Sequence, residues 1–170
     1  LYGGFHLYEY ATGGTFVAYL EENSETVKLD ETFSFNQINQ DINENNLVLV
    51  GEIHGFEEPQ KLDYELFTHL NAQFKVRQYY AEVDFVQAIY LNKYLSSGDE
   101  KFLEAALRKW AVIQGRNNKD YFDKYRKFHN YYKSLSKEDK FTVVGIDKIS
   151  DMELVSAFLE SLSPIAKQLD

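Results

Sequence analysis

Three short apolar runs, rich in β-branched or aromatic residues, stand out from the polar background of this chain. They lie at residues 47–50, 79–83 and 141–146. Near-continuous apolar runs of this length are typical of parallel strands that are buried in a sheet. We therefore predict strands at about residues 46–52, 78–84 and 141–147.

The segments between these runs carry apolar residues at helical spacing, which predicts helices that connect the strands. The first helix follows Pro59, a residue that suits an early helical position. Polar turns at 96–99 and 115–118 divide the long second gap into several helices. A last helix is expected to begin with Ser150 as its N-cap and to be interrupted at Ser163-Pro164. This order predicts an α/β fold, a parallel-stranded sheet flanked by helices, as part of a larger domain.

The beginning of the chain has a different pattern. Two glycine pairs flank aromatic stretches, and residues 15–20 have the composition of an extra strand or an edge hairpin. We therefore divide the chain into an N-terminal extension or edge hairpin at 1–34 and an α/β domain at 35–170.

Acidic side chains follow each of the three predicted strands. Glu52 and His54 come after the first, Glu82 and Asp84 end the second, and Asp147 ends the third. In open parallel sheets, ligands bind beyond the carboxyl ends of the strands, where the loops converge. The sequence thus predicts one imidazole and up to four carboxylates at one edge of the sheet.

These residues are compatible with more than one role. A histidine beside carboxylates can act as a general base towards water, and two close carboxylates can keep a proton available for a leaving group. Glu52, His54 and Glu82 are equally a ligand set for a divalent metal. In a purely structural interpretation, the strand-end acid caps a helix and the histidine satisfies backbone groups. Spacing alone does not separate these roles.

The remaining histidines and the aromatic helices are weaker candidates for chemistry. The aromatic side chains are predicted to form the core, with an apolar pocket as the alternative. The histidines in question are His6, His69 and His129, and the pocket candidates are Trp110, Tyr121, Tyr125 and Tyr132.

Composition and charge narrow the class of partner. The 170 residues are 44% hydrophobic, enough to build a core, and the formal net charge is -9. Such a charge is repelled by phosphate backbones and anionic membranes, and no apolar run approaches the length of a transmembrane helix. We expect a small-molecule substrate or ligand, no nucleic acid and no membrane span. Oligomeric state is not indicated.

Several blocks of the sequence, in order, resemble the opening blocks of the erythromycin esterase family. The resemblance covers about residues 35–150 and is carried by the series rather than by one motif. The blocks are residues 51–55 with Glu58, 66–70, 81–85, 91–94, Trp110, 125–130 and 144–147.

This resemblance implies a metal-independent hydrolase that cleaves an ester, lactone or related acyl bond. His54 would activate water, and Glu52 and Glu82 would support it. Asp84, Glu58, Arg126 and Asp147 are the expected supporting residues. The esterases also draw arginine and histidine residues from a C-terminal half, which we expect this chain to lack.

One departure from the family keeps other functions open. Only Ile53 separates Glu52 from His54, whereas the esterases usually place two residues there. The shorter spacing is similar to that of the ChaN-like haem-binding lipoproteins and the Tiki/TraB proteases, and one residue at a strand end can turn a side chain to the other face. The alternatives are therefore a protein that binds haem or a metal, or a non-catalytic scaffold. The resemblance also implies a location, because relatives with Gly- and aromatic-rich N-terminal extensions are often exported and the missing Met is compatible with a cleaved signal. We expect an exported, periplasmic or lipid-anchored bacterial protein.

Overall fold

The computed structural model describes residues 13–22, 24, 35, 39, 41–52, 54–109 and 119–166. The chain forms two compact units, Leu1–Val48 and Leu49–Asp170. In the first unit, helix α2 spans Gly14–Glu22. The predicted strand or hairpin at 15–20 was therefore wrong. A short apolar run is ambiguous between strand and helix, and here Ala18, Leu20 and two following glutamates favour the helix.

The second unit contains two parallel strands and most of the helices. Gln78 of β1 pairs with Thr142 of β2, and Ala81 pairs with Gly145. This confirms the α/β class and the predicted strands at 78–84 and 141–147, each shorter than expected.

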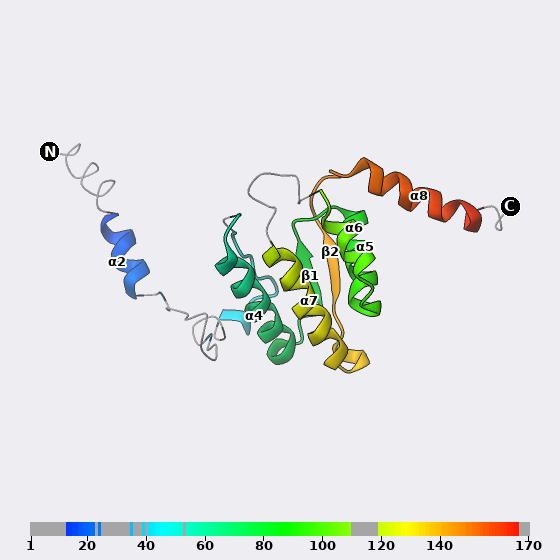
Figure 1. Cartoon of the computed structure of the whole chain (residues 1–170). Helices are drawn as coiled ribbons and strands as arrows, with labels where there is room; N and C mark the ends of the chain where they lie inside the picture. The colour runs from blue at the N-terminus through cyan, green and yellow to red at the C-terminus, as the bar shows by residue number, and fades with distance from the viewer. Residues whose placement is uncertain are drawn as a thin grey trace. The chain divides into compact units, whose positions relative to one another are not determined.

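The elements of this unit follow one another along the chain as strands separated by helices (Figure 1). They are α4 (Glu57–Phe74), β1 (Gln78–Ala81), α5 (Phe85–Ser97), α6 (Glu100–Leu107), α7 (Lys119–Ser134), η1 (Lys137–Asp139), β2 (Thr142–Gly145) and α8 (Met152–Ala166).

The first predicted strand, at 46–52, was wrong. These residues pair with no strand in the described part of the chain, and Leu47, Leu49 and Val50 are exposed. An apolar run reports a preference for a pleated, half-buried surface, but it does not specify the neighbouring strand that would provide that surface.

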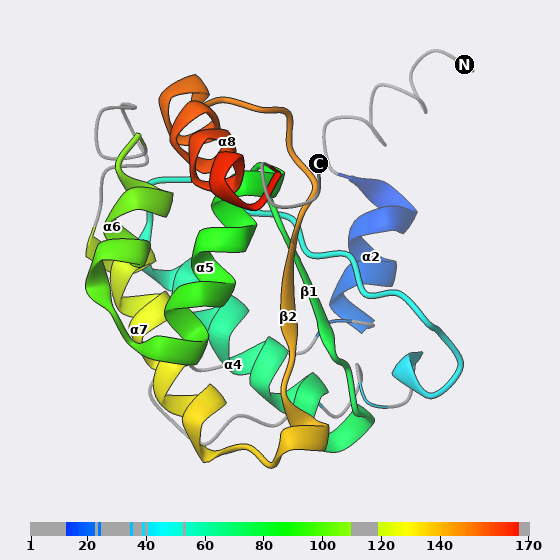
Figure 2. The same ribbon diagram turned by 90° about the vertical axis from the view of Figure 1, so that its right-hand side faces the viewer.

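The sheet buries one face rather than two. Tyr79, Ala81 and Val143 alternate towards the core, where the Tyr79 ring lies 4.9 Å from that of Phe67 in α4. Tyr80, on the opposite face, is 52% exposed. Figure 2 shows α4 behind the two strands and α5 beside β2. The helices thus hold the strands from one side and along one edge.

The outer edge of β2 is closed by a side chain of α5. Asn92 donates from Nδ2 to the Val143 carbonyl at 2.8 Å, and its Oδ1 accepts from the Val143 N–H at 2.9 Å. The amide therefore takes the place of a neighbouring strand at this position.

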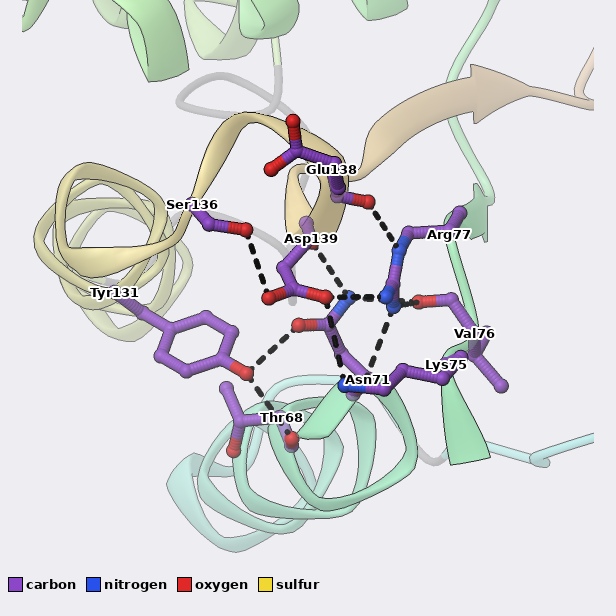
Figure 3. A network of polar contacts seen from close by, with 9 residues as sticks. All are labelled: Thr68, Asn71, Lys75, Val76, Arg77, Tyr131, Ser136, Glu138 and Asp139. Atoms are coloured by element: carbon purple, nitrogen blue, oxygen red, sulfur yellow. Dashed lines mark hydrogen bonds and ion pairs between the residues drawn. The ribbon is translucent and has the colours of Figure 1, made fainter. Parts of the chain in front are cut away.

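A polar network ties the amino ends of the strands to the helices (Figure 3). Arg77 donates to the Asp139 carboxylate at 2.6 Å and to the Glu138 carbonyl at 3.0 Å. Asn71 at the end of α4 donates to the Val76 carbonyl and accepts from the Tyr131 hydroxyl, both at 2.7 Å. This network fixes the end of the sheet opposite to the predicted site.

The start and the end of α8 differ from the prediction. The carboxylate of Asp151, rather than Ser150, accepts the hydrogen bond from the Leu154 N–H at 3.0 Å. Asp151 is also paired with Arg108, which holds its carboxylate in place. The helix continues through Pro164 to Ala166, so the expected interruption at Ser163-Pro164 was wrong. The proline acts on the preceding turn, where it removes one backbone hydrogen bond, and this does not end the helix here.

Among the described helices, none is both long enough and apolar enough to cross a membrane.

Candidate functional site

The predicted site lies at the carboxyl end of β1. Glu82 directly follows Ala81, the last residue of this strand. Glu52 and His54 lie in the segment that enters α4, where Gly55 has a φ of +91°. A positive φ favours glycine, and the turn at residues 54 and 55 brings the chain into the helix.

The imidazole of His54 lies between the two predicted glutamates. Its Nδ1 is 2.9 Å from Oε1 of Glu52, and its Nε2 is 3.3 Å from Oε2 of Glu82. The His54 side chain is one-third exposed and that of Glu82 is 56% exposed, so solvent reaches both groups. The structure thus brings together all three residues of the predicted triad, and Glu52 and His54 meet despite the shortened spacing.

Tyr121 of α7 is a fourth member of the site, and sequence reasoning did not find this role. Its hydroxyl donates a hydrogen bond to the same Glu52 oxygen and lies 3.3 Å from His54 Nδ1. The side chain is buried, so the hydroxyl reaches the site from within the core. The only signal in the sequence was its place in an aromatic helix, which any core tyrosine would share.

Glu52 is held in its charged form by these neighbours. Burial acts to raise its pKa, but this is outweighed by side-chain hydrogen bonds with Tyr121 and His54, the nearby Gln60 amide and the positive charge of Lys124. The pKa of Glu52 is therefore below its usual value. A carboxylate in this state accepts hydrogen bonds and donates none.

A buried polar cluster lies next to Tyr121. Lys124, one turn along α7 and 5% exposed, donates to the Asp63 carboxylate at 2.7 Å. The Tyr79 hydroxyl donates to the same carboxylate and lies 3.3 Å from Lys124 Nζ. The Gln60 amide is buried without a hydrogen bond of normal geometry, although it is near enough to Glu52 to lower its pKa. The charge of Glu52 thus lies close to a buried cation.

The arrangement of the three predicted residues does not fit a shared metal ion or an axial haem ligand. The carboxylates contact opposite nitrogens of one imidazole, so the three groups do not converge on a point. Within the described ranges, no group of three His, Asp or Glu side chains has the geometry of a metal site. A haem iron on Nε2 would compete with Glu82 for the same position.

The four supporting residues lie outside this contact group. Asp84 is buried and caps α5, where it accepts from the Val86 and Gln87 N–H groups. Arg126 pairs with Glu100 and with Asp123. Glu58 and Asp147 are exposed, the first at the start of α4 and the second after β2.

The other histidines are also separate from the site. His129 in α7 contacts the Leu95 carbonyl through Nδ1 at 2.9 Å. The His69 ring, in α4, packs near Phe74. His6, like the pocket candidate Trp110, lies outside the described residues.

Comparison of the chain with protein-family models, curated proteins and solved structures gave no match.

Proposed function

We propose that this protein is a hydrolase that cleaves an ester, lactone or related acyl bond, with His54 as the general base towards water. The observation that carries this proposal is the contact of a solvent-accessible imidazole with a carboxylate at each ring nitrogen. The resemblance of residues 51–55 and the following blocks to the erythromycin esterases supports the same reaction class.

The preferred tautomer of His54 follows from the two carboxylates. Both only accept hydrogen bonds, but Glu52 is nearer to the ring (2.9 Å against 3.3 Å for Glu82) and less exposed, so the neutral imidazole carries its proton on Nδ1 and its lone pair on Nε2. Nε2 and the Glu82 carboxylate are then two acceptors 3.3 Å apart. Two adjacent acceptors attract a donor, and a water molecule supplies two O–H groups.

Hydrolysis then proceeds by transfer of one proton to His54 and back. Nε2 removes a proton from water while the water oxygen bonds to the substrate carbonyl carbon, and the carbonyl electron pair moves onto its oxygen. The imidazolium donates to Glu52 and Glu82, and both negative charges stabilise it. When the tetrahedral intermediate collapses, the bond to the leaving oxygen breaks and that oxygen takes the proton from Nε2. The products are a carboxylic acid and an alcohol.

Hydrolysis of a p-nitrophenyl ester series and of macrolide lactones by the full chain tests this proposal. We expect His54→Ala to lower kcat/KM by about 100-fold or more. Glu82→Gln is expected to lower it about tenfold, because it weakens one charge-assisted hydrogen bond to the imidazolium. His69→Ala is the matched control, a histidine of α4 outside the site, and we expect it to keep wild-type activity. EDTA is expected to leave the rates unchanged.

Three results would overturn the proposal. One is equal rates for wild type and His54→Ala on every substrate, or no hydrolysis by either. Another is activity that appears only when a divalent metal is added, which points to the metal-dependent alternative. A Soret band on addition of haem, without hydrolysis, points to the haem-binding alternative.

A further inference from the structure

The Tyr121 hydroxyl contacts both groups of the hydrogen bond between His54 Nδ1 and Glu52. Its hydroxyl donates to Oε1 of Glu52, the oxygen that also lies 2.9 Å from His54 Nδ1. We propose that Tyr121 is a positioning residue that orients Glu52 and, through Glu52, fixes the His54 proton on Nδ1. This inference rests on the proposed function for its catalytic consequence, although the positioning itself is a property of the site.

Glu52 needs such an anchor because no regular element holds its segment. Glu52 lies in the irregular stretch before α4, outside the two-stranded sheet. Tyr121, in contrast, is 3% exposed and belongs to a helix whose neighbouring side chains Tyr125 and Phe128 are in the core. The hydrogen bond from Tyr121 therefore connects a side chain of an irregular segment to a helix that is packed into the core.

The geometry around Glu52 also favours one tautomer of His54. Two donors, the phenol O–H and the imidazole Nδ1–H, share one oxygen of an acceptor-only carboxylate. Sharing restricts rotation of the carboxylate, since turning it away would break both hydrogen bonds. With Glu52 held, the Nδ1–H tautomer donates to its carboxylate at 2.9 Å, whereas the Nε2–H tautomer would donate to Glu82 at 3.3 Å and would place the Nδ1 lone pair against the Glu52 oxygen. Nε2 is then free of a proton on the side where Glu82 lies.

The surrounding charges keep Glu52 in the state that this role requires. Burial raises the pKa of Glu52, but the hydrogen bond from Tyr121 is the largest of the effects that lower it. The positive charge of Lys124, one turn after Tyr121 in α7, acts in the same direction as that hydrogen bond. The anchor therefore contributes both the orientation and the ionisation of the carboxylate.

Tyr121→Phe in the full chain tests the inference, with Tyr125→Phe as matched control. Tyr125 is a buried tyrosine one turn further along α7, and its hydroxyl makes no hydrogen bond to Glu52, His54 or Glu82. We expect Tyr121→Phe to lower kcat by about 10–100-fold with KM within about twofold, as for other residues that orient a functional histidine. Tyr125→Phe is expected to keep the wild-type kcat.

Two NMR readouts do not depend on activity. In ¹⁵N-histidine spectra at alkaline pH, wild type and Tyr125→Phe should show His54 as the Nδ1–H tautomer, whereas Tyr121→Phe should show a mixture with Nε2–H. A ¹³C-carboxyl titration should give a higher pKa for Glu52 in Tyr121→Phe than in wild type. A variant with the tautomer and the Glu52 pKa of the wild type would overturn the inference.

Glu52→Gln provides a second route if Tyr121→Phe folds poorly, because it changes the acceptor of the same contact and leaves Tyr121 in place. It should also give a mixture of the two His54 tautomers, and a pure Nδ1–H tautomer would overturn the inference. Where both single variants fold, the double variant gives a further test. Because Tyr121 acts through Glu52, the kcat loss of the double variant should be smaller than the product of the two single losses, and multiplying losses would overturn the inference. If Tyr121→Phe changes the His54 tautomer while the wild-type protein hydrolyses no substrate, the positioning role is supported and the proposed function fails.

Discussion

The charge of Glu52 links the stability of the protein to pH. Its pKa is lower in the folded chain than in a free glutamate, so the folded state favours the ionised form. The resulting stabilisation is fully present above the unfolded pKa of about 4.3 and is lost as the pH falls through the folded value. We expect Glu52→Gln to lower the free energy of unfolding by about 1 kcal/mol at pH 7, and by less in acid.

Urea unfolding of wild type and Glu52→Gln at pH 7 and near pH 4 measures this difference. Glu44→Gln provides the control, since Glu44 is exposed and lies in the other unit. A gap between wild type and Glu52→Gln that grows towards acid would have the wrong sign and would show that Glu52 is not stabilised as a carboxylate.

For single residues, the sequence indicated the acids and the histidine of the site, but it did not indicate the side chains from other elements that hold them in place. Glu82 could be placed because it follows an apolar run that does form a strand. Glu52 and His54 follow the run at 47–50, which pairs with no strand among the described residues, so they meet Glu82 for a reason other than the one predicted. Tyr121 contacts Glu52 across a separation of 69 positions, and its helical neighbours look the same as those of any core tyrosine. Lys124 likewise cannot be told from a solvated surface lysine in the sequence, yet it is buried against Asp63.

Among the secondary-structure elements, β2 depends on the Asn92 amide at its outer edge. Asn92→Ala would remove both hydrogen bonds to Val143, together with one to the Ala88 carbonyl in α5, and would leave the Val143 N–H and carbonyl without these partners. We expect a loss of about 2 kcal/mol in the free energy of unfolding, because an unsatisfied backbone group costs more than a hydrogen bond contributes. Thermal or urea unfolding measures it.

Asn130→Ala is a suitable comparison for this variant. It makes the same chemical change on α7, where Asn130 is exposed, and is expected to alter stability by no more than about 0.5 kcal/mol. Equal effects of the two substitutions would mean that the contact between α5 and β2 adds nothing beyond helix propensity.

The elements that sequence reasoning placed correctly are those with partners close in the fold. The runs around 79–83 and 141–146 pair with each other, so their strand propensity is realised. The run at 47–50 has the same composition but no paired neighbour among the described residues, and the pattern carries no information on that point. Residues 15–20 failed for a related reason, since six residues are too few to separate a period of 2 from a period of 3.6.

Among the described residues, the central hydrophobic cluster and the candidate site both lie in the second unit. The central hydrophobic cluster is drawn from residues 67–143, and Glu52, His54, Glu82 and Tyr121 all lie after residue 48. The unit Leu49–Asp170 thus contains a core, a sheet and every described contact of the site. By physical criteria it has what an independent folding unit requires.

We therefore expect a chain that begins at Leu49 to fold cooperatively, with a Tm within about 5 °C of the full chain. Circular dichroism melting and the ¹⁵N-histidine spectrum of His54 measure fold and site separately. A chain that begins at Glu57 is the matched comparison, because it keeps α4 and the core but lacks Glu52 and His54. It should also fold cooperatively, but without the hydrolysis expected of the longer one. If the chain from Leu49 melts without a cooperative transition, residues before position 49 contribute to the core, and the division into two units does not describe how this protein folds.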